Sequence, residues 1–467
     1  MTDHPMSFDD FRRHGHALVD LIADHLETVE QRPIVPDVQP GWVRSQLSDA
    51  APAQPEDFDD VLADLTRVVE PALLGWQHPG FMGFFPANAS LPAILGELAS
   101  AGFGQIGMMW WTSPAATELE NHVLDWLVDA MGLPGAWRTD SGVGGGVIQG
   151  TASEASHTAM VVARQRAVER GASTDELVAY GSAQAHSSIE KGAKVAGYRH
   201  VRLVDVDDAY ALRPEEFARL VESDLEAGLV PAVVTSTVGT TATAAVDPLR
   251  SISQVARRHR LWHHVDAAYA GSAMLCQEFR HHVDGVELAD SYVFNPHKWL
   301  LTNFDCSVMW VADRRPLIDT MSIAPPYLRN EATESGAVID YRDWHLPLGR
   351  RFRALKLWFV LRSYGTDGLR AMLRQHVAMA RGLADRLAAD PRFELVAPVA
   401  FSLVCFVHRD GDGATDRVAR HLNAAGDVYV TPSVLPDGRR FVRVAVGQAR
   451  TEQRHVDRAW QLIDVAG

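Results

Sequence analysis

Residues 294–300 read Phe-Asn-Pro-His-Lys-Trp-Leu, and the lysine of this stretch, Lys298, decides how the rest of the chain is interpreted. It lies between two short apolar runs, residues 291–294 and 299–301. A lysine amine is costly to bury unless it is paired or neutralised. A Schiff base with an aldehyde cofactor meets that condition, because the charge then belongs to a covalent imine. A lysine that ends a strand and reaches water is the simpler alternative.

A carboxylate, Asp266, follows residues 261–265, an apolar run typical of a buried strand. Ligand sites in open α/β sheets form just past the carboxyl ends of parallel strands. There the carboxylate could keep a pyridine nitrogen protonated, a pairing that enzymes dependent on pyridoxal 5′-phosphate (PLP) need. Capping of the helix that follows is an equally good interpretation of Asp266 alone.

A glycine-rich stretch, residues 144–150, precedes Thr151 and Ser153 and a helical segment, residues 154–166. Glycines let the backbone approach a ligand closely, and the N–H groups at the start of a helix favour a phosphate. A flexible turn is the alternative. The stretch is not a Walker A loop, because no Gly-Lys-Ser/Thr follows it.

A histidine, His186, follows another strand-like run, residues 177–180. Such a side chain could stack on a flat cofactor ring and titrate near neutral pH. A single histidine is more often structural, so this residue gains weight only from its neighbours in the sequence.

These four pieces, in this order, resemble the group II PLP-dependent amino-acid decarboxylases, and within them the aromatic L-amino-acid decarboxylases. The resemblance covers nearly the whole chain. It is carried by the stretches 76–79, 84–86, 113–120, 146–150, 186–188, 264–271, 295–299 and 347–353.

The resemblance implies an α/β fold, the aspartate-aminotransferase-like fold type I of PLP-dependent transferases, with a mostly parallel sheet, flanking helices and a small α+β C-terminal domain. It implies that Lys298 holds PLP as a Schiff base and that Asp266 pairs with the pyridine nitrogen. His186 and Ala268 would pack on the two faces of the ring, and Tyr327 would return a proton to the substrate. The phosphate would be held by Thr151, Ala152, Ser153 and Asn295, with His297 beside it. Thr241 would lie near the ring oxygen and His186.

The resemblance also implies a substrate wall with few charges, which suits an aromatic side chain and leaves a glutamate carboxylate unpaired. Gly349 would leave space for an indole or catechol ring. We therefore expect decarboxylation of tryptophan, 5-hydroxytryptophan, phenylalanine, tyrosine or DOPA to the arylalkylamine and CO₂. The other residues implied in this wall are Trp76, Phe84, Phe85, Pro86 and Ala87, with Ile106 and Met108 supplied by the neighbouring subunit.

Three alternatives stay open. An aldehyde synthase of the same family would let oxygen reach the carbanion, but Tyr327 and His186 favour the amine. A histidine or glutamate decarboxylase is disfavoured by the apolar wall and Gly349. A PLP-fold regulatory protein should carry a basic DNA-binding module, whereas the first 80 residues are acidic and proline-rich.

Composition narrows the class of protein. The 467 residues carry a net charge of −15, which disfavours a nucleic-acid partner. No apolar run is long enough to span a bilayer, and no secretion signal is evident, so we expect a cytoplasmic protein. The three cysteines show no metal spacing and are odd in number, and the adjacent histidine pairs diverge, so we expect neither a disulfide framework nor a metal.

The pattern of apolar runs predicts three units: an N-terminal helical segment at 1–80, a large α/β domain at 81–370 and a small α+β domain at 371–467. The resemblance implies that the first is a dimerisation segment and that the second binds PLP. Ser7 is expected to cap a first helix with one apolar stripe. Strands are expected at 177–180, 201–204, 232–236, 261–265 and 292–294, and in the small domain at 401–407, 428–430 and 441–446, after a helix at 353–389. The resemblance implies a homodimer with active sites at the interface.

Overall fold

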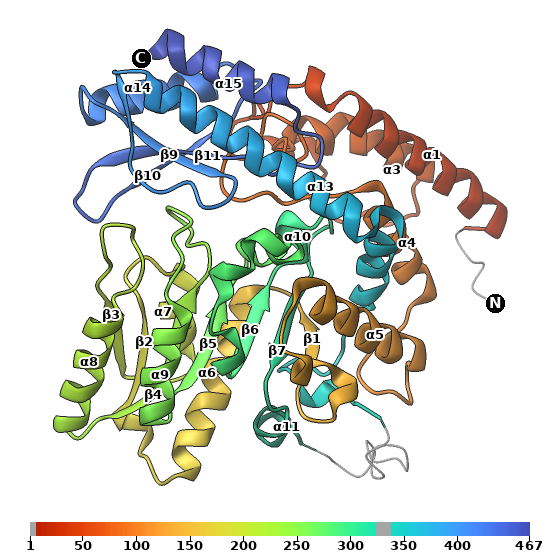
Figure 1. The fold of residues 1–467 in the computed structure, drawn as a ribbon. Helices are drawn as coiled ribbons and strands as arrows, with labels where there is room; N and C mark the ends of the chain where they lie inside the picture. Colours follow the sequence, from red (N-terminus) through yellow and green to blue (C-terminus); the bar gives the residue numbers. More distant parts are fainter. Residues whose placement is uncertain (1–5, 324–337) are drawn as a thin grey trace.

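The fold is built on two sheets, which are described by a computed structural model of residues 6–323 and 338–467. The larger sheet has seven strands in the order β1-β7-β6-β5-β4-β2-β3 (Figure 1). All pairs from β6 to β3 are parallel, and β7 is antiparallel to both of its neighbours. The prediction of a mostly parallel sheet is therefore confirmed. Its strands are β1 (Gly145–Gln149), β2 (Leu177–Ser182), β3 (His200–Val204), β4 (Val230–Thr237), β5 (Trp262–Asp266), β6 (Ser291–Phe294) and β7 (Ser307–Val311).

Strand β1 was not expected, because its glycines are typical of a turn. The structure gives these glycines a packing role. A Cβ atom at Gly145 would lie 2.6 Å from the Trp344 ring, and one at Gly146 would lie 2.7 Å from the Trp310 indole nitrogen. Two large rings thus close onto opposite sides of the strand, which only a residue without a side chain permits.

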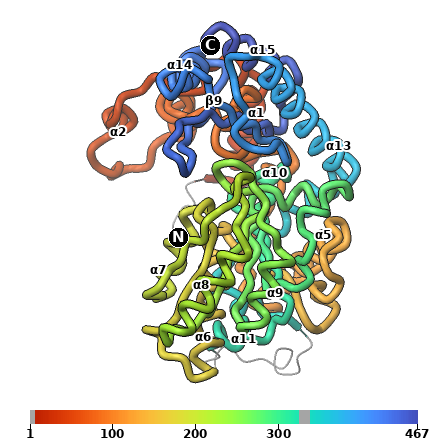
Figure 2. The backbone as a smooth tube through the Cα atoms, turned by 60° about the vertical axis from the view of Figure 1, so that its left-hand side comes forward, coloured from red at the N-terminus to blue at the C-terminus, as the bar shows by residue number. Residues whose placement is uncertain are grey.

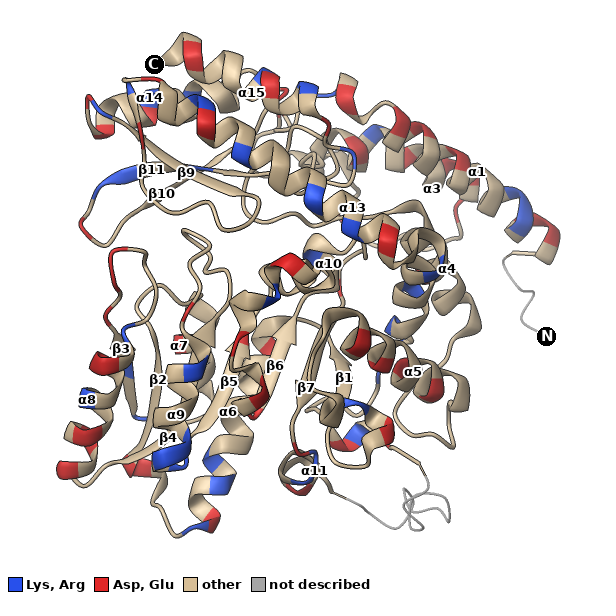
Figure 3. Ribbon diagram, viewed as in Figure 1, with Lys and Arg blue, Asp and Glu red and all other residues tan. Residues whose placement is uncertain are grey.

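Side chains of the large sheet alternate between two apolar layers, as the two-residue period of a strand requires. In β6, Val293 packs with one layer, whereas Tyr292 and Phe294 pack with the other. The strands carry few charged side chains (Figure 3). Helices α6 (Ala152–Glu169), α7 (Ser187–Val195) and α11 (Arg315–Met321) cover one face, and α5 (Pro114–Met131), α8 (Pro214–Glu226) and α9 (Leu249–His259) cover the other.

The second sheet has four antiparallel strands in the order β10-β11-β9-β8, as expected for a small α+β unit. The expectation of a strand at residues 428–430 is wrong: β10 begins at Thr431. Tyr429 instead exchanges backbone hydrogen bonds with Gly80 and Met82, 3.0 and 2.8 Å long, which anchor an N-terminal loop. The elements are β8 (Phe393–Leu395), β9 (Leu403–His408), α14 (Asp412–Ala424), β10 (Thr431–Val434), β11 (Arg440–Ala445) and α15 (Gln453–Ala466).

Helix α13 (Arg353–Ala389) has the predicted bounds and leads from the large sheet to the small one. Its backbone is not helical at Gly365, where φ is 61° and ψ is 164°, so two helical segments meet at a kink. Residue 370, the predicted end of the large domain, lies within this helix. The division of the chain into three domains stays a prediction.

The N-terminal helix α1 (Phe8–Glu27) starts with the expected cap, in which Ser7 Oγ accepts the Asp10 N–H at 3.1 Å. Only His14 of this helix is buried, and Phe8 is 84% exposed. The N- and C-terminal segments lie together at one end of the molecule (Figure 2), joined by an Arg454–Glu30 ion pair of 2.7 Å. The remaining helices are α2 (Trp42–Gln46), α3 (Phe58–Asp64), α4 (Leu91–Phe103) and α10 (Pro296–Trp299). Within residues 6–323 and 338–467, no helix is long and apolar enough to cross a membrane.

The packing behind β6 gives a prediction about stability. A Cβ atom at Gly271 would lie 2.4 Å from Phe294 Cβ and 2.8 Å from the Tyr292 hydroxyl. We expect Gly271→Ala to lower the free energy of unfolding by about 1–3 kcal/mol through overpacking. The matched change Gly382→Ala, at a helical position with no atom within 4 Å, should raise it by up to about 1 kcal/mol. Urea unfolding of both variants checks this, and equal midpoints would contradict the packing.

Candidate active site

A cavity of about 200 Å³ lies where five strands of the large sheet end. Strands β1, β2, β4, β5 and β6 run in the same direction, so their carboxyl ends share one edge of the sheet. All ten residues predicted to contact the cofactor line this cavity. The complete lining is Phe85, Thr151, Ala152, Ser153, His186, Ser188, Thr237, Gly239, Thr241, Asp266, Ala268, Tyr269, Asn295, His297 and Lys298.

The amine of Lys298 faces this cavity from α10, directly after β6. Its backbone carbonyl accepts a hydrogen bond of 2.8 Å from Asn88, and its Nζ lies 5.6 Å from the centre of the Phe85 ring. Burial lowers the pKa of Lys298. The charge of Asp266 opposes that shift, and the charge of Arg443 adds to it. A lysine held in this way loses its proton more readily than a lysine in water.

Asp266 is 4% exposed, and its Oδ1 accepts the Ala268 N–H at 2.9 Å. The carboxylate thus holds the turn that follows β5, but it does not cap a helix, because the next helical element begins at Ala270 with Tyr269 at its N-cap position. The residue also lines the cavity, as the functional interpretation requires. The backbone hydrogen bond fixes the direction of the carboxylate relative to the Lys298 amine.

His186 is oriented by the start of helix α7. Its Nδ1 accepts the Ser188 N–H at 3.2 Å and lies 2.8 Å from the Ser188 hydroxyl. The neutral ring therefore carries its proton on Nε2. Enclosure by the cavity walls, followed by the positive charge of Lys298, lowers the pKa of His186. A neutral, flat ring is the result.

The predicted phosphate site lies at the start of helix α6. Thr151 Oγ1 accepts the Glu154 N–H at 3.3 Å, which caps this 18-residue helix. Asn295 Oδ1 accepts the Ser307 hydroxyl at 2.7 Å, so its amide nitrogen is left for a ligand. Burial lowers the pKa of His297 to about 3, so this histidine is neutral. Anion binding here depends on N–H groups and hydroxyls rather than on a cation.

One further group in the cavity indicates a polar ligand. The Thr237 side chain, at the end of β4, is buried, and its hydroxyl has no hydrogen-bond partner within the described part of the chain. A buried hydroxyl without a partner is unfavourable. A lysine amine, a fixed carboxylate, a helix N-terminus and this hydroxyl around one small cavity fit an aldehyde-bearing pyridine ring with a phosphate.

The predicted substrate residues divide into four groups. Phe85 alone lines the cavity and stacks on Tyr269 with 3.8 Å between ring centres. Its neighbour Phe84 adopts a left-handed backbone, with φ of 51°, and points the other way. It lies 5.6 Å from the Trp76 ring in an aromatic cluster with Phe81 and Tyr429.

Pro86 packs against Gly447, and the Ala87 carbonyl accepts a hydrogen bond of 2.6 Å from Gln77. Ile106, Met108 and Gly349 lie away from the cavity but close to one another. A Cβ atom at Gly349 would lie 3.8 Å from Ile106 Cγ2, and Ile106 is 56% exposed. Tyr327 lies outside the described residues.

Several lining residues escaped sequence reasoning. Thr237 could have been found, because it ends a parallel strand. Arg443 does not line the cavity itself but contacts Phe85, which does. It had no local signal in the sequence, since it comes from β11 of the small sheet. Its guanidinium lies 5.2 Å from the Phe85 ring centre, and its Nε donates to the Ala242 carbonyl at 3.0 Å. Burial lowers the pKa of Arg443. The others are Ser188, Gly239 and Tyr269.

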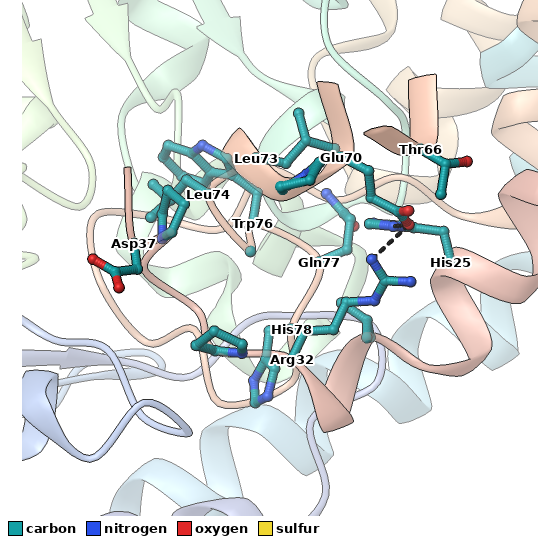
Figure 4. A pocket seen from close by; sticks show the side chains of 15 residues that line it. His25, Arg32, Asp37, Thr66, Glu70, Leu73, Leu74, Trp76, Gln77 and His78 are labelled. Carbon is teal, nitrogen blue, oxygen red and sulfur yellow. Dashed lines mark hydrogen bonds and ion pairs between the residues drawn. The ribbon is translucent and has the colours of Figure 1, made fainter. Parts of the chain in front are cut away.

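A second cavity, of about 470 Å³, lies among the N-terminal elements (Figure 4). There Arg32 points toward Glu70, which also contacts His25, with N–O distances of 2.6 Å for both pairs. This second cavity has no lining residue in common with the Lys298 cavity. Trp76, which was predicted to contact the substrate, lines the second cavity instead. In the described ranges, no group of three or more His, Cys, Asp or Glu side chains could hold a metal ion.

Comparison with known proteins decides the family. The model of the pyridoxal-dependent decarboxylase conserved domain matches residues 40–409. The chain belongs to this family. It is 44% identical over 472 residues to tryptophan decarboxylase 2 of Oryza sativa subsp. japonica, covering 98% of this chain and 95% of that relative. It is also 44% identical over 473 residues to phenylacetaldehyde synthase of Arabidopsis thaliana, covering 98% and 96%.

Among solved structures, the crystal structure of Oryza sativa TDC with PLP and tryptamine is similar with a TM-score of 0.97 and 40% identity, covering 100% of this chain and 99% of that one. The predicted family, fold class, PLP cofactor and carboxy-lyase assignment are confirmed by these similarities. Relatives named tryptophan, tyrosine and aromatic-L-amino-acid decarboxylases agree with the predicted substrate class.

The charges around Lys298 predict a pH dependence. An amine reacts with an aldehyde only when it is deprotonated, so capture of PLP by the apoprotein should be half-maximal below the ordinary lysine pKa of 10.5. Asp266→Asn removes a charge that raises the pKa and should move the midpoint lower. Arg443→Met removes a charge that lowers it and should move the midpoint higher. The growth rate of the visible absorbance across a pH series measures this; the reverse order would contradict the electrostatics.

Proposed function

We propose that this protein decarboxylates aromatic L-amino acids to arylalkylamines and CO₂. The observation that carries the proposal is the convergence of all ten predicted cofactor residues on one cavity that also contains an apolar wall, Phe85. When bound, PLP supplies an aldehyde for the substrate amine and a ring that accepts the electron pair released with CO₂.

The chain's own groups divide the remaining work. Lys298, whose pKa is lowered by burial, would hold the cofactor through its amine. Asp266 keeps the ring nitrogen protonated by a charge that is already in place. His186 covers one ring face as a neutral ring, and Ala268 covers the other. The proton that replaces CO₂ on the substrate is assigned to Tyr327, and such a positioned acid contributes about 10²–10⁴-fold in rate.

Arg443 supplies a cation for the substrate's carboxylate. Arg443 is 3% exposed, and within the described residues its hydrogen bonds go to two backbone carbonyls, those of Ala242 and Phe84, rather than to a carboxylate. A buried cation favours an anion beside it. The guanidinium lies over the Phe85 ring, so a substrate would present its carboxylate and its aromatic ring to neighbouring side chains.

The protein acts as a homodimer in this proposal. Three of the predicted substrate residues, Ile106, Met108 and Gly349, lie outside the cavity of their own chain. The surface around them exposes Leu346 by 77% and Trp111 by 69%, and α4 exposes Leu91, Leu95 and Leu98 in a row. Large exposed apolar patches mark protein interfaces. A second copy would cover this surface and receive the missing part of its substrate wall.

An aldehyde synthase is the second candidate. The observation that favours it is the phenylacetaldehyde synthase relative, which is as identical to this chain as the tryptophan decarboxylase is. Overall identity therefore does not separate the two activities, and Tyr327 is the residue that favours the amine.

The three cysteines are free and buried, which fits a reducing compartment, and we place the protein in the cytoplasm.

Product analysis tests the proposed activity. The PLP-loaded protein would receive an equimolar mixture of tryptophan, 5-hydroxytryptophan, phenylalanine, tyrosine, DOPA, histidine and glutamate in air, and the products would be identified by mass spectrometry. We expect aromatic amines without aldehyde. Aldehyde with peroxide would establish the synthase instead, and histamine or 4-aminobutyrate alone would contradict the aromatic substrate class. Lys298→Ala should abolish turnover, whereas the exposed control Lys191→Ala should retain it.

A further inference from the structure

The stretch 347–353, one of those that carry the family resemblance, contains an arginine with no role in the chemistry described so far. Arg350 is buried, and its Nη2 lies 2.6 Å from Glu120 Oε1 on helix α5; both side chains are 3% exposed. A buried ion pair is a poor source of stability, because desolvation offsets the attraction between the charges. Its position in the fold therefore calls for another reason.

The pair holds the outer edge of strand β1. Strand β1 is the edge strand of the large sheet, so the groups on its outer side have no neighbouring strand. The Ile148 N–H donates to Glu120 Oε1 at 2.7 Å, and the Ile148 carbonyl accepts from Arg350 Nη2 at 2.8 Å. The ion pair thus replaces a missing strand at the point where β1 leads into Gly150 and Thr151, the start of the cofactor cradle.

The same arginine holds the predicted substrate wall. Its backbone carbonyl accepts the Gly107 N–H at 2.9 Å, and Gly107 lies between Ile106 and Met108. Gly349 directly precedes Arg350 and faces Ile106. Gly349 is therefore the chain neighbour of Arg350, and Ile106 and Met108 are the chain neighbours of Gly107, which is hydrogen-bonded to Arg350.

The guanidinium of Arg350 packs on the ring of Tyr341. Arg350 Cζ lies 4.4 Å from the centre of that ring, and the Tyr341 hydroxyl lies 3.1 Å from the Gly146 carbonyl of β1. The planar guanidinium can stack on this ring while it bonds both Glu120 and Ile148. A lysine ammonium keeps the charge but cannot reproduce that planar geometry.

We propose that Arg350 is a positioning residue that sets the substrate wall of Ile106, Met108 and Gly349 relative to the cofactor cradle at Gly150 and Thr151. This inference rests on the proposed function, because it takes the wall and the cradle as parts of active sites. In the homodimer the wall belongs to the partner's site, so Arg350 joins the cradle of one site to the substrate wall of the other.

Hydrogen exchange of the apoprotein, followed by mass spectrometry, tests the connection without any turnover. In Arg350→Met, residues 104–110 and 146–151 should both exchange at least several-fold faster than in the wild type. Arg350→Lys should restore part of the protection. The control is Arg202→Met, which breaks an ion pair of 2.7 Å with the buried Asp224 at the opposite edge of the sheet. It should leave both segments unchanged.

Kinetics of the loaded protein provide the second readout. We expect Arg350→Met to raise the KM for the preferred aromatic amino acid about tenfold with a smaller change in kcat, and to accelerate PLP release, because wall and cradle are both displaced. Faster exchange in only one of the two segments, or the same pattern in Arg202→Met, would overturn the proposal. A wild type inactive toward aromatic amino acids would refute the proposed function, while the exchange data would still decide whether Arg350 joins the two segments.

Discussion

The proposed chemistry depends on one lysine amine, that of Lys298, whose surroundings lower its pKa. Lys298 lies between a carboxylate, Asp266, that favours its charged form and a buried cation, Arg443, that opposes it. Burial is the largest of these effects and leaves the amine ready to react. The arrangement requires five strand ends to meet at one edge of the sheet, and it requires the small sheet to contribute Arg443 from the other side. The large sheet, α10 and β11 therefore form one site.

Much of the cavity could be predicted from the sequence, because several of the residues proposed to hold the cofactor follow directly after predicted strands. Asp266, Asn295 and Lys298 each lie within a few residues of a strand end, and parallel strands place such residues together. Strand β1 could not be predicted, since its glycines are explained only by Trp310 and Trp344, which are distant in the sequence. Arg443 was missed for the same reason: its partners Phe85 and Ala242 come from other parts of the fold.

The residues predicted to form the substrate wall lie in several separate places of this chain. Phe84 and Phe85 are adjacent in the sequence, yet the left-handed backbone at Phe84 sends them to different places. Ile106 and Gly349 are adjacent in space, yet they lie on an exposed surface rather than at the cavity. Helix α1 likewise leaves most of its apolar stripe uncovered. In the homodimer that we propose, a second copy of the chain would cover these exposed residues and complete the active site.

Mapping the lysine that binds PLP tests the account most directly. The chain has four lysines, of which Lys191 and Lys194 are exposed on α7 and Lys356 is buried in an ion pair with Glu97. Borohydride reduction of the PLP-loaded protein would make the attachment permanent. Cleavage after arginine would then give separate peptides, with Lys298 in residues 281–314, Lys356 in 354–362 and the α7 lysines in 171–199. We predict that the phosphopyridoxyl group is found on residues 281–314 alone. Its presence on either of the other peptides instead would contradict the central role of Lys298.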